Sequence, residues 1–184
     1  MDRIKLHLGC GARFIPGFTH IDLGDYEHID FNSDIRDLSM FDNDTVDLVY
    51  CCHALEYFDR IEALLVLGEW RRVLKPGGVL RVSVPDFESI VTVYQNAGDL
   101  DSPGILGPLY GKWQNENNSD ALYHRTVYDF KSLTKVLTRA GFSNVVRYDV
   151  SKTEHRDFDD YSQAYIPHMD KTGVLISLNV EAVK

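Results

Sequence analysis

Short apolar runs alternate along this chain with longer stretches of helical spacing. The short runs predict strands at residues 4–9, 18–23, 28–35, 44–54, 79–86, 144–151 and 173–184, and apolar positions three or four apart predict helices at 60–74, 86–98 and 126–142. Such alternation is typical of α/β proteins, in which helices flank a parallel sheet. We therefore expect a mostly parallel sheet. The last two strands have no obvious helix between them and should form an antiparallel edge pair.

Turn and cap residues predict where the helices begin and end. The run Pro76-Gly77-Gly78 should end the first helix, while Asp86 and Asp129 should cap the other two at their N-termini. In the first helix we expect a core-facing set made up of Leu64, Leu65, Gly68, Val73 and Leu74.

The connections after the first two strands are unusually short. Only ten residues separate Gly11 from Asp22, whereas a crossover between parallel strands normally takes a dozen or more and contains a helix. We expect shortened first crossovers made of nearly bare loop. Residues 98–124 are rich in glycine, proline, asparagine and serine and indicate an irregular insertion.

Composition narrows the class of protein. With 184 residues, 44% of them hydrophobic, the chain can bury the core of one domain, which we take to span residues 1–184. The net charge of −9 disfavours a nucleic acid as partner. No apolar run has the length of a membrane span or of a secretory h-region, and three cysteines do not make a disulfide framework. We expect a cytoplasmic protein without a membrane partner.

Candidate ligand-binding residues gather where the predicted strands end. Gly9 and Gly11 follow the first strand and would let the backbone approach a ligand closely. Asp22 ends the second strand, where a carboxylate can accept hydrogen bonds from ribose hydroxyls, and Asp34 ends the third. Either aspartate could instead be a strand-end cap or a turn residue.

Several segments occur together in the order found in one enzyme family: "HLGCG", "HIDL", "SDIRDL", "DLVYCCHALEYF", "LKPGG" and "LRVSVPD". In these the chain resembles the class I S-adenosylmethionine-dependent methyltransferases. It is most similar to a group of small predicted methyltransferases whose first loop has the form G-C-G-x(4)-P-G-[FWY]. The likeness covers residues 4–86 well and 122–150 moderately. It implies a Rossmann-like fold.

The resemblance implies a cofactor and its contacts. S-adenosylmethionine would be the methyl donor and S-adenosylhomocysteine the product, with a small polar molecule as the acceptor. By this resemblance the glycine turn would approach the methionine part of the cofactor. Asp22 would accept hydrogen bonds from the ribose hydroxyls, and Asp34 would accept one from the adenine amine. The implied cofactor contacts are Gly9, Cys10, Gly11, Asp22, Leu23, Asp34, Ile35, Cys52 and His53.

A general base is needed only where an O–H or N–H acceptor must lose a proton. His53 follows the fourth strand at the edge where ligands bind, and His124 ends the insertion, which could act as a substrate-side lid. Either could be the base, although each could equally be a packed wall residue. Glu56 could orient His53 or simply begin the next helix.

The chain departs from the family pattern in places, and other functions stay open. Arg13 stands where such loops usually have a third glycine; it could reach the methionine carboxylate or face solvent. This loss and the bare crossovers leave an inactive cofactor-binding or scaffold domain as the alternative. A nicotinamide dehydrogenase is disfavoured because G-x-G-x-x-G is absent.

We expect no metal site. Consecutive Cys51, Cys52 and His53 lack the spacing of zinc ligands. The segment 155–170 carries histidines and aspartates, but an acidic surface loop is the favoured interpretation.

Overall fold

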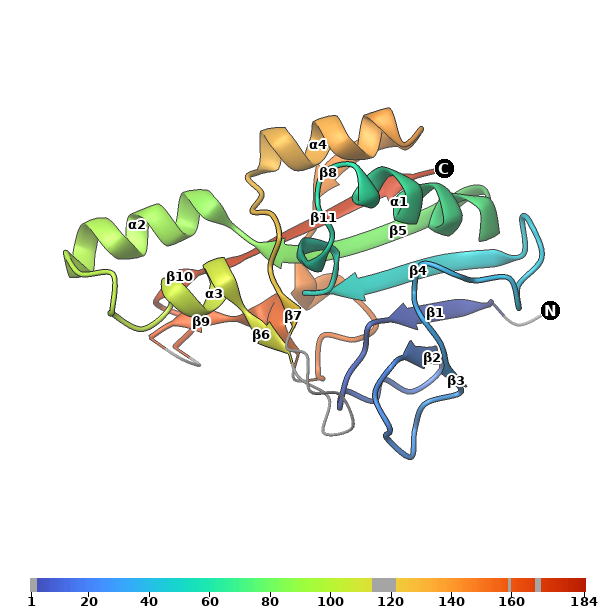
Figure 1. Cartoon of the computed structure of the whole chain (residues 1–184), viewed down its shortest axis with the longest axis horizontal. Helices are drawn as coiled ribbons and strands as arrows, with labels where there is room; N and C mark the ends of the chain where they lie inside the picture. The colour runs from blue at the N-terminus through green and yellow to red at the C-terminus, as the bar shows by residue number, and fades with distance from the viewer. Residues whose placement is uncertain (1–2, 114–121, 159, 168–169) are drawn as a thin grey trace.

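The computed structural model describes residues 3–113, 122–158, 160–167 and 170–184. Its centre is a seven-stranded sheet of order β3-β2-β1-β4-β5-β11-β8 (Figure 1). The first five strands in that order run parallel, and β11 pairs antiparallel with both β5 and β8. The predicted mostly parallel α/β sheet with an antiparallel C-terminal strand is confirmed. The strands are β1 Lys5–Leu8, β2 Thr19–Asp22, β3 Phe31–Asn32, β4 Val46–Cys52, β5 Leu74–Pro85, β8 Ser143–Arg147 and β11 Ser177–Val183.

Two helices cover one face of the sheet, α1 (Glu62–Val73) and α4 (Phe130–Arg139), and they pack against each other (Figure 1). Between them and the strands lies the main core, with fully buried Leu6, Val49 and Trp70. Burying side chains of this size is the main stabilising contribution to such a fold. The remaining elements are α2 Phe87–Ala97, α3 Leu106–Tyr110, β6 Lys112–Trp113, β7 Leu122–Tyr123, β9 Tyr165–Ile166, β10 Val174–Leu175 and the 3₁₀ helices η1 Leu55–Tyr57, η2 Val150–Lys152 and η3 Tyr161–Gln163.

The predicted caps of α2 and α4 are confirmed. The Asp86 carboxylate accepts a hydrogen bond from the backbone N–H of Glu88 at 3.2 Å. Asp129 accepts from the backbone N–H of Ser132 at 2.6 Å, and the Ser132 hydroxyl accepts from the Asp129 N–H at 3.1 Å. This reciprocal pair is a capping box, which satisfies donors that the helix itself leaves free.

Two expectations for α1 are wrong. The helix ends at Val73 rather than at the Pro76-Gly77-Gly78 run, because Leu74 is already extended and begins β5. Leu65 is 74% exposed instead of facing the core, and Gly68 is exposed as well. Apolar residues surround this helix on most sides, so their spacing does not define one face. The buried face is centred on Trp70 and consists of Ala63, Val66, Leu67, Trp70 and Val73.

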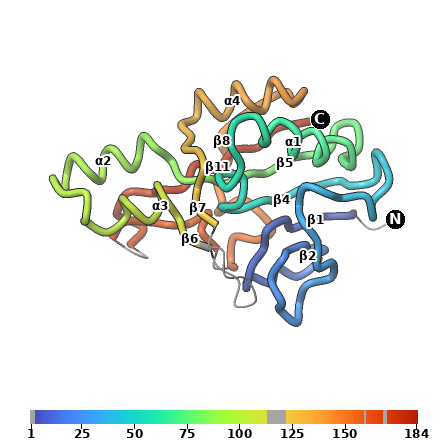
Figure 2. Tube along the Cα trace, in the orientation of Figure 1, coloured from blue at the N-terminus to red at the C-terminus, as the bar shows by residue number. Residues whose placement is uncertain are grey.

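The opposite face of the sheet has no helix over β1 and β2. The connections after these strands are bare loops, as predicted (Figure 2). A row of paired polar residues crosses this face from strand to strand, and all but Glu181 are buried. The loop residues Ile15 and Phe18 cover part of it, together with Phe158 from the C-terminal third of the chain. The row consists of His20, His7, Tyr50, Arg81 and Glu181.

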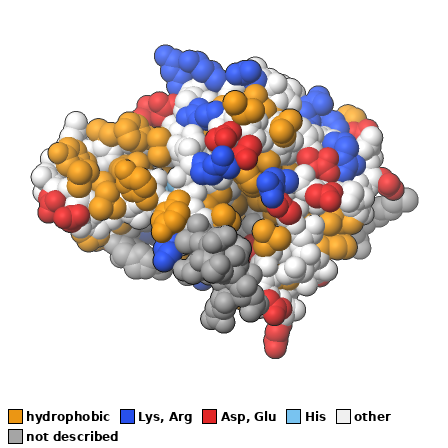
Figure 3. Space-filling view, in the orientation of Figure 1, with side chains coloured by type: hydrophobic (Ala, Val, Ile, Leu, Met, Phe, Trp, Pro, Cys, Tyr) orange, Lys and Arg blue, Asp and Glu red, His pale blue; other side chains and the backbone are white. Residues whose placement is uncertain are grey.

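Helix α2 packs on a smaller cluster through Ile90 and Val93. Hydrophobic side chains gather on the surface over α2 and α3 (Figure 3). The exposed hydrophobic residues of these two helices include Phe87, Tyr94 and Tyr110. Within the described residues no helix combines the length and apolar character that crossing a membrane requires.

Candidate functional site

The carboxyl ends of β1, β2 and β4 open into one cavity of about 780 Å³. In parallel sheets this edge is where ligands bind. Nine residues predicted to contact a cofactor line this cavity: Gly9, Cys10, Gly11, Asp22, Leu23, Asp34, Ile35, Cys52 and His53. The structure therefore brings together residues that come from four separate segments of the sequence.

The turn after β1 requires glycine at its first position. Gly9 has φ +64°, a region that other residues rarely adopt, and a Cβ there would lie 2.6 Å from the Cβ of Ala54. Gly11 also has positive φ, at +52°, but a Cβ there would meet nothing within 4 Å. Gly9 thus permits a close approach of two strand ends, whereas Gly11 leaves space open beside the cavity.

Asp22 holds the turns on both sides of β2. Its carboxylate accepts hydrogen bonds from the backbone N–H groups of Gly11 and Gly24, both at 2.7 Å, and the residue is only 7% exposed. Each carboxylate oxygen can accept a second hydrogen bond. Asp22 can therefore fix the glycine turn and still offer acceptor capacity to a ligand.

Asp34 is bound to a neighbouring arginine at another part of the cavity wall. Arg36 donates to it from Nε at 2.9 Å and from Nη2 at 2.5 Å. Burial acts to raise the pKa of Asp34, but the hydrogen bonds from Arg36 outweigh it and lower the pKa below its usual value. The adjacent Ile35 carbonyl accepts from the Trp70 indole at 2.8 Å, which fixes the backbone here.

The two histidines predicted as bases both approach Glu56. His53 Nδ1 lies 3.5 Å from Glu56 Oε1, and His124 Nε2 lies 3.7 Å from the same oxygen. His53 lines the cavity and has φ +54°, a conformation rare outside glycine that recurs at functional sites. His124 does not line the cavity but stands behind His53 and Glu56.

Burial governs the charges of this trio. It raises the pKa of Glu56 to about 8. Burial, with the nearby His124, lowers the pKa of His53 to about 3, and burial also lowers the pKa of His124. The carboxyl group and both imidazoles are therefore neutral at pH 7, an unusual state for an acid beside two bases.

Further residues of the cavity wall were not singled out from the sequence. Tyr57, Lys112, Arg125 and Tyr161 all line it, and so does Asp160, which belongs to the segment 155–170 considered above. They come from η1, the β6–β7 hairpin, the segment before α4 and the η3 region, and nothing in their local sequence marks these positions as neighbours.

Side chains from the surrounding segments differ in whether they reach the cavity. Arg13 lines the cavity, with its guanidinium 5.7 Å from the ring centre of Tyr161. Tyr123 lines the cavity as well, whereas Tyr128 is buried beneath Arg60. Residues 114–121 of the expected insertion lie outside the described residues.

The segment 155–170 is not simply an acidic surface loop. His155 and Asp160 are both buried, and Asp160 accepts a hydrogen bond from the Tyr50 hydroxyl. Asp159 and His168 lie outside the described residues. Among the parts of the chain that are described, no three His, Cys, Asp or Glu side chains are placed to hold a metal ion.

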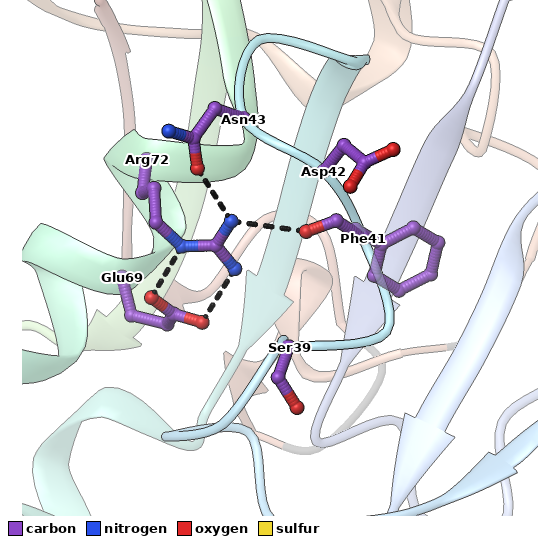
Figure 4. A pocket seen from close by; sticks show the side chains of 6 residues that line it. All are labelled: Ser39, Phe41, Asp42, Asn43, Glu69 and Arg72. Atoms are coloured by element: carbon purple, nitrogen blue, oxygen red, sulfur yellow. Dashed lines mark hydrogen bonds and ion pairs between the residues drawn. The ribbon is translucent and has the colours of Figure 1, made fainter.

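A second cavity of about 670 Å³ lies beside α1 (Figure 4). At its centre Arg72 donates to both oxygens of Glu69 and to Asn43, and also to the carbonyls of Phe41 and Leu38. This arginine is committed to holding the loop before β4 against α1, which is a structural role.

Comparisons with known proteins agree with this geometry. A family model described as a methyltransferase domain matches residues 19–82. A search of curated proteins gave no match. Among solved structures, a SAM-dependent methyltransferase from Archaeoglobus fulgidus superposes with a TM-score of 0.57 at 15% identity, covering 99% of this chain and 86% of its own. A SAM-dependent methyltransferase from Methanosarcina mazei superposes with a TM-score of 0.56 at 17% identity, covering 100% of this chain and 92% of its own.

A third structure was solved with ligands. The 1,6-didemethyltoxoflavin-N1-methyltransferase from Burkholderia thailandensis, with bound 1,6-didemethyltoxoflavin and S-adenosylhomocysteine, has a TM-score of 0.54 at 14% identity and covers 98% of this chain and 70% of its own. At such identities these likenesses show the shared Rossmann-like methyltransferase fold. The match of the family model to residues 19–82 agrees with that fold.

Proposed function

We propose that this chain transfers a methyl group from S-adenosylmethionine to a small polar acceptor. The observation that carries the proposal is the single cavity at the strand ends, which joins a glycine turn, two strand-end aspartates and a strained histidine. These features come from separate segments, and a merely structural role for each would not require that they share one space.

The residues present fit the cofactor. The turn at Gly9 brings the backbone to the cavity without a side chain in the way. Asp22 keeps acceptor capacity for a ribose, and Asp34 with the backbone of Ile35 would hold the adenine. Cys10, Gly11, Leu23, Cys52 and His53 complete the proposed contacts. When bound, S-adenosylmethionine supplies a methyl group already activated on a sulfonium, so the protein needs chiefly to position the acceptor and exclude water.

The acceptor would enter on the side of β6 and β7, which belong to the insertion. Lys112, Leu122 and Tyr123 of the β6–β7 hairpin line the cavity, and Tyr161 faces His53 with 5.6 Å between ring centres. A wall of aromatic rings with a few charged tips suits a small polar molecule. We take residues 98–124 as the substrate-side part of the single domain.

An inactive cofactor-binding domain would keep the cavity but lose turnover. The test is incubation of the protein with methyl-labelled S-adenosylmethionine and a panel of alcohols, catechols, amines and thiols. Label transferred by the wild type and lost in Gly9→Ala supports an enzyme. S-adenosylhomocysteine binding without transfer to any member of a broad panel would favour the inactive domain.

A further inference from the structure

Glu56 is an isolated acid in the interior. It is 0% exposed, and among the described residues neither of its carboxylate oxygens has a hydrogen-bond partner. Its position is fixed, because its backbone carbonyl accepts from the N–H of Arg125 at 2.8 Å. A buried charge without partners is strongly disfavoured. The surroundings of Glu56 must therefore explain how this side chain is tolerated.

A chain of hydrogen bonds defines which nitrogen of His53 carries the proton. Asn179 donates through its amide nitrogen to the Ser162 carbonyl at 2.8 Å, which turns its oxygen toward Ser177. The Ser177 hydroxyl donates to that oxygen at 3.3 Å. The hydroxyl is therefore left to accept from His53 Nε2 at 3.0 Å. The proton resides on Nε2, so Nδ1, which lies 3.5 Å from Glu56 Oε1, holds the lone pair.

His124 is held as the other tautomer. Its Nδ1 lies 2.9 Å from the Pro108 carbonyl, which can only accept, so Nδ1 carries the proton. Nε2 then presents its lone pair to the same oxygen of Glu56. The ring fits because residue 111 is glycine: a Cβ there would lie 2.1 Å from His124 Nε2.

Two imidazole nitrogens that hold lone pairs thus lie 3.5 and 3.7 Å from one carboxyl oxygen. An ionised carboxylate would repel both lone pairs, whereas a protonated carboxyl can donate to either ring once that ring closes to hydrogen-bond distance. We propose that Glu56 carries a proton shared with His53 and His124, and that this unit receives the proton lost by an O–H or N–H methyl acceptor. The second half rests on the proposed function, and it makes the substrate a protic oxygen or nitrogen compound.

The proton balance is simple. The acceptor atom uses a lone pair to form its new bond to the methyl carbon, while the carbon–sulfur bond of the donor would break with its electron pair going to sulfur. The acceptor then releases its proton and keeps the electrons of the broken O–H or N–H bond. His53 lines the cavity and takes up that proton on Nδ1. The unit then holds two protons, and both imidazoles can donate to an ionised Glu56. One positive charge leaves the donor sulfur and one appears on the unit, so the net charge of the site stays constant.

Among the described residues, the other groups around the unit are either neutral or paired with an opposite charge. Tyr57 lies edge-on to His124, with 4.8 Å between ring centres. Burial raises the pKa values of both Tyr57 and Tyr128 to about 12, so both phenols stay neutral. Arg60 lies over Tyr128, and Arg125 pairs with Asp59 and Glu62. Tyr161 flanks His53 from η3.

The protonation state can be tested without turnover. Infrared spectra of the wild type and Glu56→Gln at pH 7 should differ by one protonated-carboxyl band, which Glu88→Gln, an exposed control on α2, should leave unchanged. Nitrogen NMR should show neutral imidazoles, protonated on Nε2 in His53 and on Nδ1 in His124. Identical carboxyl regions in wild type and Glu56→Gln, or a charged imidazole at pH 7, would overturn the shared proton.

The catalytic half needs a rate comparison. Glu56→Gln should slow methylation of a catechol or an amine by roughly 100-fold or more. A thiol, which ionises by itself near pH 8.5, should be affected far less. Equal loss for all acceptors would contradict proton uptake. His124→Gln provides a second variant if Glu56→Gln folds poorly by circular dichroism. Calorimetry with S-adenosylhomocysteine separates the two proposals. If the protein does not bind this ligand but still shows the carboxyl band of Glu56, the proposed methyl transfer is wrong and the protonated state of Glu56 is still supported.

Discussion

The carboxylate of Asp22 accepts a hydrogen bond from the backbone N–H of Gly11 at 2.7 Å. This bond joins the end of β2 to the turn after β1, across a crossover that has no helix. In a full-length crossover a helix would hold these two strand ends. Here the Asp22 side chain does so together with the backbone bond from the Gly9 N–H to the Ile21 carbonyl at 2.9 Å, and Asp22 also accepts from Gly24 on its other side.

Asp22→Ala should lower the free energy of unfolding by about 1–3 kcal/mol, because two N–H groups near the cavity lose their acceptor. Urea denaturation of the two proteins measures this. Asp25→Ala is the matched control, since Asp25 is exposed on the same loop. Equal midpoints for both variants would show that the Asp22 bonds do not support the turn.

The two glycines of the first turn should respond differently to alanine. Gly9→Ala forces a Cβ against Ala54, at 2.6 Å, in addition to the strain of positive φ. Gly11→Ala meets only the backbone strain, about 1–2 kcal/mol. We expect Gly9→Ala to weaken S-adenosylhomocysteine binding far more than Gly11→Ala does. Titration of S-adenosylhomocysteine into both variants measures this, and equal affinities would contradict the prediction.

Acid should destabilise the polar face of the sheet. Burial, with the charges of His20, His155 and His28, lowers the pKa of His7 to about 3. Between that value and the ordinary 6.5 the unfolded chain binds a proton that the folded chain does not, so stability is lost as the pH falls through this window. Unfolding free energies measured from pH 7 to pH 4 should decline less steeply in His7→Phe. Parallel curves for the two proteins would refute the assignment.

Arg72→Lys should be costly despite keeping the charge. The guanidinium binds Glu69 through two nitrogens and reaches the carbonyl of Phe41 (Figure 4). It also donates to the carbonyl of Leu38 in the same loop. Lysine cannot reproduce this fork. We expect thermal unfolding to show a loss of about 1–3 kcal/mol, while S-adenosylhomocysteine affinity stays unchanged. A weakened affinity would connect this loop to the cofactor cavity.

Local sequence predicted the elements whose signals are local. Strands β1, β2 and β4 are short apolar runs, and the caps at Asp86 and Asp129 depend on residues within one helical turn. The face of α1 was not predictable, because its apolar residues surround the helix and only the position of Trp70 against Ile35 selects one side.

The candidate site also contains some features that follow from local sequence and others that depend on the fold. The glycine turn and the strand-end aspartates follow from their place after apolar runs. The burial of Glu56 does not, because it depends on His124, which the insertion delivers from far along the chain. A glutamate at a helix start is ordinarily a solvated residue, and only the fold places two imidazoles beside it. The polar row across the face opposite α1 and α4 likewise arises from strand pairing and not from any one strand.

The claim that the cavity holds S-adenosylmethionine is tested most directly by calorimetric titration of S-adenosylhomocysteine into the wild-type protein, with NAD⁺ as the control ligand. The account predicts one binding site per chain with an affinity in the micromolar range, about −8 kcal/mol, and no heat from NAD⁺. Absence of binding at millimolar S-adenosylhomocysteine would contradict it.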